Sequence, residues 1–197
     1  MCSSDLRAPK TEPIVTVKHI PTIPNAMSAV GALLACKGAE HLGSYQGLVA
    51  TVAGRSLDVL DGPVARATGQ TSNFGAVVDA SLDKIATAKI LYELVKKDAI
   101  PREITALLGA SQAVNALATA VTMAKHPGKP IRPTKSGKLA LAGETLSMFS
   151  YALASAAEHS GHEKVAAYSR AVGAAAFAAA LPLATHATYS YVKQVWQ

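Results

Sequence analysis

Aromatic and charged residues are scarce in this sequence. Phe, Trp and Tyr make up only 5% of its 197 residues and charged residues only 16%, whereas half of the residues are apolar. This composition excludes a disordered chain, which needs many charges and few apolar residues. It offers few large side chains for the core of a water-soluble protein, while abundant Ala and Gly suit helices that pack closely in lipid. The composition therefore favours a folded membrane protein.

Cysteine is rare as well. The two cysteines, Cys2 and Cys36, have no metal-ligand spacing and imply no disulfide framework. The first residues lack the charged segment and the apolar stretch of a secretory signal. When back-translated, residues 2–6 match the end of a common sequencing adapter. We therefore expect residues 1–6 to be a sequencing scar.

Long stretches without Asp, Glu, Lys or Arg occur twice, at residues 104–124 and 171–192. Each is long enough to cross a bilayer, which takes about 20 residues. Four further apolar stretches lie at residues 23–36, 45–67, 74–95 and 139–157; the first is shorter, and charged residues interrupt the other three. Gly, Pro and Ser separate these stretches. The alternation of apolar and polar residues that is typical of β-strands does not continue over any long segment. The sequence thus predicts an all-α polytopic membrane protein with six transmembrane helices in residues 23–197, after a cytoplasmic or interfacial segment in residues 1–22.

Basic residues are concentrated in one loop. Between residues 125 and 138 there are five basic residues and no acid. Because basic loops stay in the cytoplasm, this loop and both termini are expected inside. The formal net charge of +6 then fits anionic lipid headgroups, and no nucleic-acid partner is expected. A soluble helical bundle that binds nucleic acid through this charge stays open as an alternative. The prediction is an integral protein of a bacterial or archaeal inner (cytoplasmic) membrane, with its active site facing the cytoplasm.

Four aspartates lie where carboxylates are expensive in a membrane. Asp58 and Asp61 share one face of the second predicted helix, and Asp79 and Asp83 share one face of the third. In an antiparallel hairpin, equal distances from the turn mean equal depth, so Asp61 faces Asp79 and Asp58 faces Asp83. Four such carboxylates cannot all stay ionised without cations, and hard divalent ions would satisfy them.

Two alternatives to a metal site stay open at this point. One is a proton relay through the aspartates, and the second is a set of salt bridges between helices. The cations available for such bridges are Arg55, Arg66, Lys84 and Lys89.

The residues around the aspartates form a longer pattern. It reads Asp58-x-x-Asp61-Gly62-x-x-Ala65-Arg66, then eight residues, then Gly75-x-x-x-Asp79-x-x-x-Asp83. Eight fixed residues make a chance match to one start site about 10⁻¹⁰ in probability. The pattern matches every fixed position of the motif that defines the CDP-alcohol phosphatidyltransferase family, so the chain resembles that family.

The resemblance implies an enzyme of phospholipid synthesis. Family members transfer the phosphatidyl group of CDP-diacylglycerol to a small alcohol and release CMP, with two Mg2+ or Mn2+ ions as cofactors. The implied acceptor is a phosphorylated alcohol such as glycerol 3-phosphate or inositol phosphate. The resemblance also suggests a homodimer in the lipid bilayer. Two alternatives stay open, namely a soluble CDP-alcohol donor for the same fold and a non-catalytic membrane protein that retains the fold.

The resemblance also assigns roles residue by residue. Asp58, Asp61 and Asp79 would hold one ion, and Asp61, Asp79 and Asp83 the other. Asp83 would also be the catalytic base that deprotonates the acceptor hydroxyl. The residues that would bind the nucleotide are Gly62, Ala65, Arg66 and Gly75. The residues that would capture the acceptor's phosphate are Arg132, Lys135 and Lys138.

Details outside this motif bear on the acceptor. Pro24-Asn25 followed by Ser28 resembles the Pro-Asn-x-x-Thr pattern of the family's first helix, with Ser in place of Thr. Thr134-x-x-Gly137-Lys138 resembles an element of phosphatidylglycerophosphate synthases, whereas Arg132-Pro133 resembles members that use inositol phosphate. The acceptor therefore stays open.

One further acid stands out on the fifth predicted helix. A buried Glu144 would need a partner, for which Lys89 or Arg66 is the expected cation.

Overall fold

The computed structural model describes residues 22–70, 73–125 and 134–195, which form six helices and no strand. In chain order these are α1 (Ile23–Glu40), α2 (Tyr45–Ala67), α3 (Asn73–Lys96), α4 (Arg102–Lys125), α5 (Lys135–His159) and α6 (Glu163–Val195). The expectation of an all-α fold with six helices is confirmed for these residues. The N-terminal segment of residues 1–21, the loop of residues 126–133 and with it Arg132 lie outside the described part.

Polar residues placed before the first turn begin three of the helices. Thr22 caps α1 by accepting a hydrogen bond from the backbone N–H of Asn25, and Ser44 caps α2 by accepting one from Gly47. Thr134 caps α5 through the backbone N–H of Gly137 at 3.1 Å. Each side chain satisfies a backbone donor that has no partner within its helix. The Thr-x-x-Gly spacing before α5 thus has a local structural role as a helix cap.

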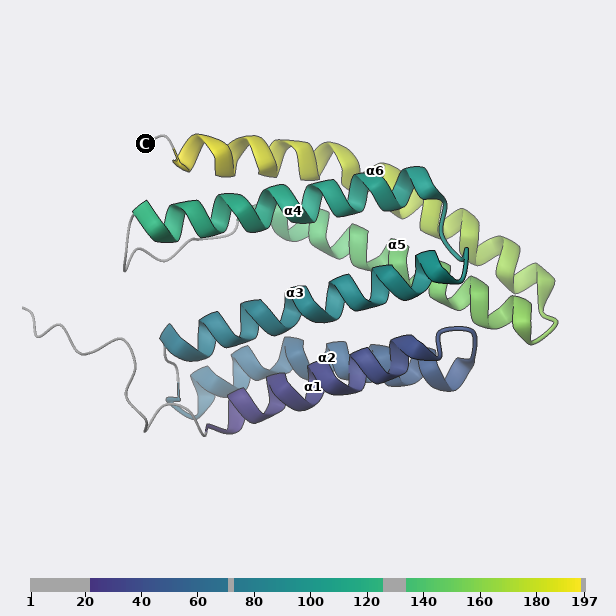
Figure 1. Cartoon of the computed structure of the whole chain (residues 1–197), viewed down its shortest axis with the longest axis horizontal. Helices are drawn as coiled ribbons and strands as arrows, with labels where there is room; N and C mark the ends of the chain where they lie inside the picture. The colour runs from purple at the N-terminus through teal and green to yellow at the C-terminus, as the bar shows by residue number, and fades with distance from the viewer. Residues whose placement is uncertain (1–21, 71–72, 126–133, 196–197) are drawn as a thin grey trace, which may run out of the picture.

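The six helices form two groups of three that lie one above the other in Figure 1. In one group α1 packs on α2 and α3, and in the other α6 packs on α5 and α4. The contacts between the groups are fewer and join α2 and α3 to α5, and α3 to α4. The hairpin of α2 and α3, which carries all four aspartates, therefore has α1 on one side and the second group on the other.

Glycines bring α1 and α2 into close contact. A Cβ atom added to Gly31 would lie 2.7 Å from the carbonyl oxygen of Gly54, and one added to Gly38 would lie 2.5 Å from the backbone nitrogen of Thr51. A Cβ on Gly54 would lie 2.5 Å from the backbone nitrogen of Ala35. These atoms belong to the backbone and cannot rotate away. The small residues therefore set the distance between the two helices, and through it the position of the aspartates on α2.

One helix of the described part is long and apolar enough to cross a membrane by length and composition, over Glu163–Ser190 in α6. The expectation of six spans is thus supported by this criterion for one helix only. Charged residues inside helices such as α2 and α3 lower their hydropathy, which is why hydropathy is a weak test of this chain.

Many large apolar side chains also lie on the outside of the helices. Examples with more than half of their surface exposed are Leu33, Val49, Val59, Leu60, Ile85, Leu117 and Leu146. They come from five of the six helices, so the exposed apolar surface is spread around the molecule. Water-soluble monomers seldom expose apolar residues on this scale, whereas lipid-facing surfaces do.

Candidate functional site

Three aspartates meet between α2 and α3. Asp58, Asp61 and Asp79 each offer one carboxylate oxygen, and these three oxygens all lie within 4.8 Å of one another. Asp61 is buried with 5% of its surface exposed, and the other two are partly buried. The antiparallel hairpin therefore brings Asp61 and Asp79 to the same level, as their equal distances from the turn predict.

The chemistry of this cluster fits a hard divalent cation. Carboxylate oxygens are the ligands that Mg2+ and Mn2+ prefer, and three of them this close repel one another strongly when ionised. In addition, the Oδ1 atom of Asp58 is buried and has no hydrogen-bond partner among the described residues. Buried carboxylate oxygens without a partner are costly, and a bound cation would satisfy this one.

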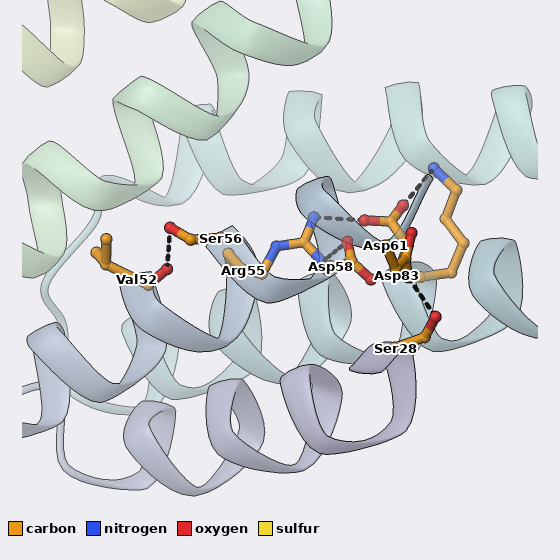
Figure 2. Close-up of polar contacts among 8 residues, drawn as sticks. Ser28, Val52, Arg55, Ser56, Asp58, Asp61 and Asp83 are labelled. Carbon is orange, nitrogen blue, oxygen red and sulfur yellow. Dashed lines mark hydrogen bonds and ion pairs between the residues drawn. The ribbon is translucent and has the colours of Figure 1, made fainter. Parts of the chain in front are cut away.

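Asp83 stands apart from the three-carboxylate cluster. Its Oδ1 accepts a short hydrogen bond from Nη2 of Arg55, and Nη1 of the same guanidinium lies 3.1 Å from Oδ2 of Asp58. Figure 2 shows the guanidinium between the two carboxylates. One side chain reaches both aspartates, so Asp58 and Asp83 do lie at the same level. They are joined through Arg55, which the sequence suggested only as one of several salt-bridge partners.

The first helix contributes Ser28 to the site. Its hydroxyl donates a short hydrogen bond to Oδ2 of Asp61, drawn in Figure 2, and is buried with the carboxylate. The hydroxyl also lies 3.0 Å from the carbonyl oxygen of Pro24, one turn earlier in α1. Ser28 therefore orients Asp61 within the cluster, which gives the Pro-Asn-x-x-Ser pattern a physical role.

Replacing Ser28 with alanine should weaken Mn2+ binding about 10-fold, because residues that orient a metal ligand typically contribute this much affinity. Ser28→Thr retains the hydroxyl and should bind Mn2+ as the wild type does. Titration with Mn2+, followed by the paramagnetic resonance signal of the free ion, measures both. Equal affinities for Ser28→Ala and wild type would show that Asp61 needs no support from α1.

Three of the four expected nucleotide residues follow Asp61 on α2, and the fourth lies near the start of α3. Gly62 and Ala65 follow Asp61 on α2 and are partly buried, and Gly75 is partly buried near the start of α3. Among the described residues, a Cβ added to Gly62 would meet only Nη1 of Arg66, at 3.6 Å. Helix packing therefore does not require a glycine here, unlike at Gly54. The space beside Gly62 is open to a ligand.

Arg66 is exposed near the end of α2, and no ion pair holds it among the described residues. A guanidinium that is not held by a protein carboxylate is available for the oxygens of a phosphate.

The expected acceptor residues are placed only in part. Lys135 and Lys138 are exposed in the first turn of α5, while Arg132 lies outside the described residues. Ser136, between them, lies 3.0 Å from Nδ1 of His186, which ties the start of α5 to α6. No hydrogen bond or ion pair within the described residues links these lysines to the aspartates.

Glu144 is buried as expected, with 4% of its surface exposed, but the expected partners are wrong. Its carboxylate accepts hydrogen bonds from Ser111 at 3.0 Å and from Gln112 at 2.7 Å, both on α4. Gln112 in turn accepts one from Lys84 at 2.8 Å. Lys89 is held instead by Glu93, at 2.7 Å, near the other end of α3.

This chain of contacts connects Glu144 to the site. Lys84 follows Asp83 in the sequence, and its Nζ lies 3.9 Å from Oδ2 of that residue. A polar connection therefore runs from α5 through α4 to α3, across the boundary between the two groups of helices. Sequence reasoning missed Gln112, because an amide within an apolar stretch gives no signal of what it contacts.

Comparison with known proteins places this site in a family. The sequence profile of the CDP-alcohol phosphatidyltransferases matches residues 15–185, which include α1 to α5 and most of α6. The chain belongs to the CDP-alcohol phosphatidyltransferase family. The four aspartates of the α2–α3 hairpin lie within the matched residues.

One curated relative is an archaetidylinositol phosphate synthase from Pyrococcus horikoshii, 31% identical over 101 residues. That alignment covers 47% of this chain and 50% of the relative, so the chain spans about half the length of the curated relative it matches. No solved structure matches this chain.

Proposed function

We propose that this protein transfers the phosphatidyl group of a CDP-activated lipid to a small phosphorylated alcohol and releases CMP. The observation that carries the proposal is the cluster of Asp58, Asp61 and Asp79 on the α2–α3 hairpin of a family member. Three carboxylates that meet between helices repel one another, and Oδ1 of Asp58 has no hydrogen-bond partner among the described residues. The cluster therefore costs stability, which favours a functional reason for it. The carboxylates are suited to a reaction at a diphosphate.

Two divalent ions belong to this proposal. Asp58, Asp61 and Asp79 would hold one Mg2+ or Mn2+, and Asp61, Asp79 and Asp83 would hold the second. When bound, such ions neutralise the phosphate oxygens of the donor and stabilise the charge that develops during transfer.

The chain's own residues supply the remaining steps. Arg66 binds the diphosphate of the donor, and Gly62 allows the nucleotide to approach α2. Asp83 accepts the proton of the acceptor hydroxyl as that oxygen forms a bond to the phosphorus nearest the lipid. The bond from this phosphorus to the bridging oxygen breaks, and CMP leaves with the electron pair. Lys135, Lys138 and Arg132 attract the phosphate of the acceptor.

We favour inositol phosphate as the acceptor over glycerol 3-phosphate. The relative is named for an archaetidylinositol phosphate product, and Arg132-Pro133 resembles the members that use inositol phosphate. The same name makes an ether-linked CDP-lipid a donor to test beside CDP-diacylglycerol.

The proposed place of this reaction is a membrane. The apolar span in α6 and the large apolar side chains exposed on the helices support six transmembrane helices. We propose an inner membrane, an active site facing the cytoplasm, and a homodimer. Sodium carbonate washing followed by ultracentrifugation tests the location, because release of the protein into the supernatant would contradict it.

The decisive experiment is CMP release by protein purified in detergent, with Mg2+ or Mn2+. Each CDP-lipid is offered separately with inositol phosphate, glycerol 3-phosphate, inositol or serine, and Asp83→Asn is the inactive control. We expect CMP release with inositol phosphate and with none of the other three acceptors, and we expect Asp83→Asn to lose this release. Folded protein that binds metal but releases no CMP with any acceptor would contradict the proposal and leave a soluble CDP-alcohol donor or a non-catalytic role.

Gly62→Ala separates nucleotide binding from folding. Among the described residues the added methyl group meets only the end of a flexible side chain, and alanine favours a helix over glycine by up to about 1 kcal/mol. The free energy of unfolding should therefore stay unchanged or rise, while the KM for the CDP-lipid rises several-fold because the methyl group occupies the approach to α2. The matched control is Gly109→Ala on α4, where a Cβ meets no atom of the described residues within 4 Å. This variant should gain stability without a change in KM.

A further inference from the structure

Arg55 holds two carboxylates from different helices with one guanidinium. Its Nη1 contacts Asp58 on its own helix and its Nη2 contacts Asp83 on α3. The three side chains are well shielded, with 15%, 10% and 21% of their surfaces exposed for Arg55, Asp58 and Asp83. Charge-assisted hydrogen bonds in such shielded surroundings are strong and geometrically specific. Figure 2 shows this bridge beside Asp61.

The bridge affects Asp58 and Asp83 differently. Asp58 gives one oxygen to Arg55, while its other oxygen is buried without a partner among the described residues. It can therefore take part in the cluster with Asp61 and Asp79 while Arg55 stays in place. For Asp83 the situation differs, because both of its oxygens face cations, Arg55 at Oδ1 and Lys84 at Oδ2.

We propose that Arg55 is a built-in counter-ion that makes the two divalent ions bind unequally. This inference rests on the proposed function, since it concerns how its second ion is admitted. Asp58, Asp61 and Asp79 accept the first ion without disturbing the bridge. The ion at Asp83 must displace the guanidinium from that carboxylate, and the positive charge of Arg55 also repels it. Arg55 thus acts on the reaction through Asp83, as a positioning residue.

The experiment counts Mn2+ ions bound per chain, from the paramagnetic resonance signal of free Mn2+, in the absence of nucleotide. The wild type should bind one ion tightly and the second at least about 10-fold more weakly, since the second ion competes with a charge-assisted hydrogen bond. Arg55→Gln keeps a polar side chain of similar length but removes the charge. It should bind the second ion at least about 10-fold more tightly than the wild type.

Arg102→Gln is the matched control, because Arg102 is exposed at the start of α4 and this change alters the net charge by the same amount. It should leave both affinities unchanged. If Arg55→Gln does not fold, Arg55→Lys is the second variant. Its single ammonium nitrogen cannot bind both carboxylates as the guanidinium does, so the affinity for the second ion should rise, by less than in Arg55→Gln.

Two results would overturn the inference. An unchanged ratio of the two affinities in the Arg55 variants would show that the bridge does not compete with the ion. A loss of the tight ion would show that Arg55 instead supports the cluster. Either result, obtained while the wild-type protein releases CMP, leaves the proposed function standing. Wild-type protein that binds no Mn2+ would overturn the two-metal function together with this inference.

Discussion

Replacing Asp61 with asparagine should reduce CMP release by about 10³-fold or more. Asp61 is the most deeply buried of the clustered aspartates, and in the proposed function it holds both ions. A 10³-fold loss corresponds to about 4 kcal/mol in the barrier, which is within what metal and charge stabilisation contribute to phosphoryl transfer. Asparagine keeps the size of the side chain and an oxygen that accepts from Ser28, so the fold should be retained.

Stability measurements make this test specific. Mn2+ at saturating concentration should raise the melting temperature of the wild type, because an ion that binds only the folded state stabilises it. The Asp61→Asn protein should show no such rise. Without metal, this variant should be at least as stable as the wild type, since it removes one buried charge from a group of like charges.

The control for this variant is Asp98→Asn. Asp98 is exposed between α3 and α4 and has a positive φ of 49°, which asparagine adopts readily. The substitution removes one negative charge as Asp61→Asn does, but at a position outside the hairpin that carries the cluster. Full CMP release and a normal response to Mn2+ are expected. If both variants lost activity equally, the loss would come from a general electrostatic effect rather than from metal binding.

The positions of the helices were largely predictable from the sequence. Breaks in apolar stretches mark helix ends, as at Ser44, whose side chain caps α2, whereas α5 begins at Lys135, inside the predicted loop of residues 125–138. The equal distances of Asp61 and Asp79 from one turn predicted that they meet, because helix rise is regular. Hydropathy marks one helix of the described part as able to span a membrane, because charges inside helices such as α2 and α3 lower their hydropathy. A local pattern thus gives helix bounds and the pairing within one hairpin.

Contacts between distant helices were not predictable in this way. Periodicity shows that Glu144 lies on α5 but not that α4 places Ser111 and Gln112 beside it. The prediction of a cation beside Glu144 was wrong, because two neutral hydrogen-bond donors satisfy its carboxylate. Similarly, Arg55 was one of four plausible cations, and only the geometry of α2 against α3 shows that it reaches both Asp58 and Asp83.

The close contact of α1 and α2 gives the second large prediction, which concerns Gly54→Ala. The added Cβ would lie 2.5 Å from both the carbonyl oxygen of Gly31 and the backbone nitrogen of Ala35. Neither atom can move without its helix, so the two helices must separate. Overpacking of this kind costs about 1–3 kcal/mol in the free energy of unfolding. Unfolding of the detergent-purified protein by heat or denaturant, followed by circular dichroism, measures the loss.

The activity of this variant should fall as well, because Gly54 directly precedes Arg55 and lies one turn before Asp58. Separation of α1 from α2 also moves Ser28 away from Asp61, so Mn2+ affinity should decrease together with stability. Gly109→Ala is the matched control, since its Cβ would meet no atom within 4 Å in the part of the chain that the structure describes. This substitution within a helix should stabilise the protein by up to about 1 kcal/mol. Opposite signs for the two substitutions are expected because glycine is required by packing at one site and only tolerated at the other. A Gly54→Ala protein as stable as the Gly109→Ala protein would mean that the α1–α2 contact has room for a methyl group.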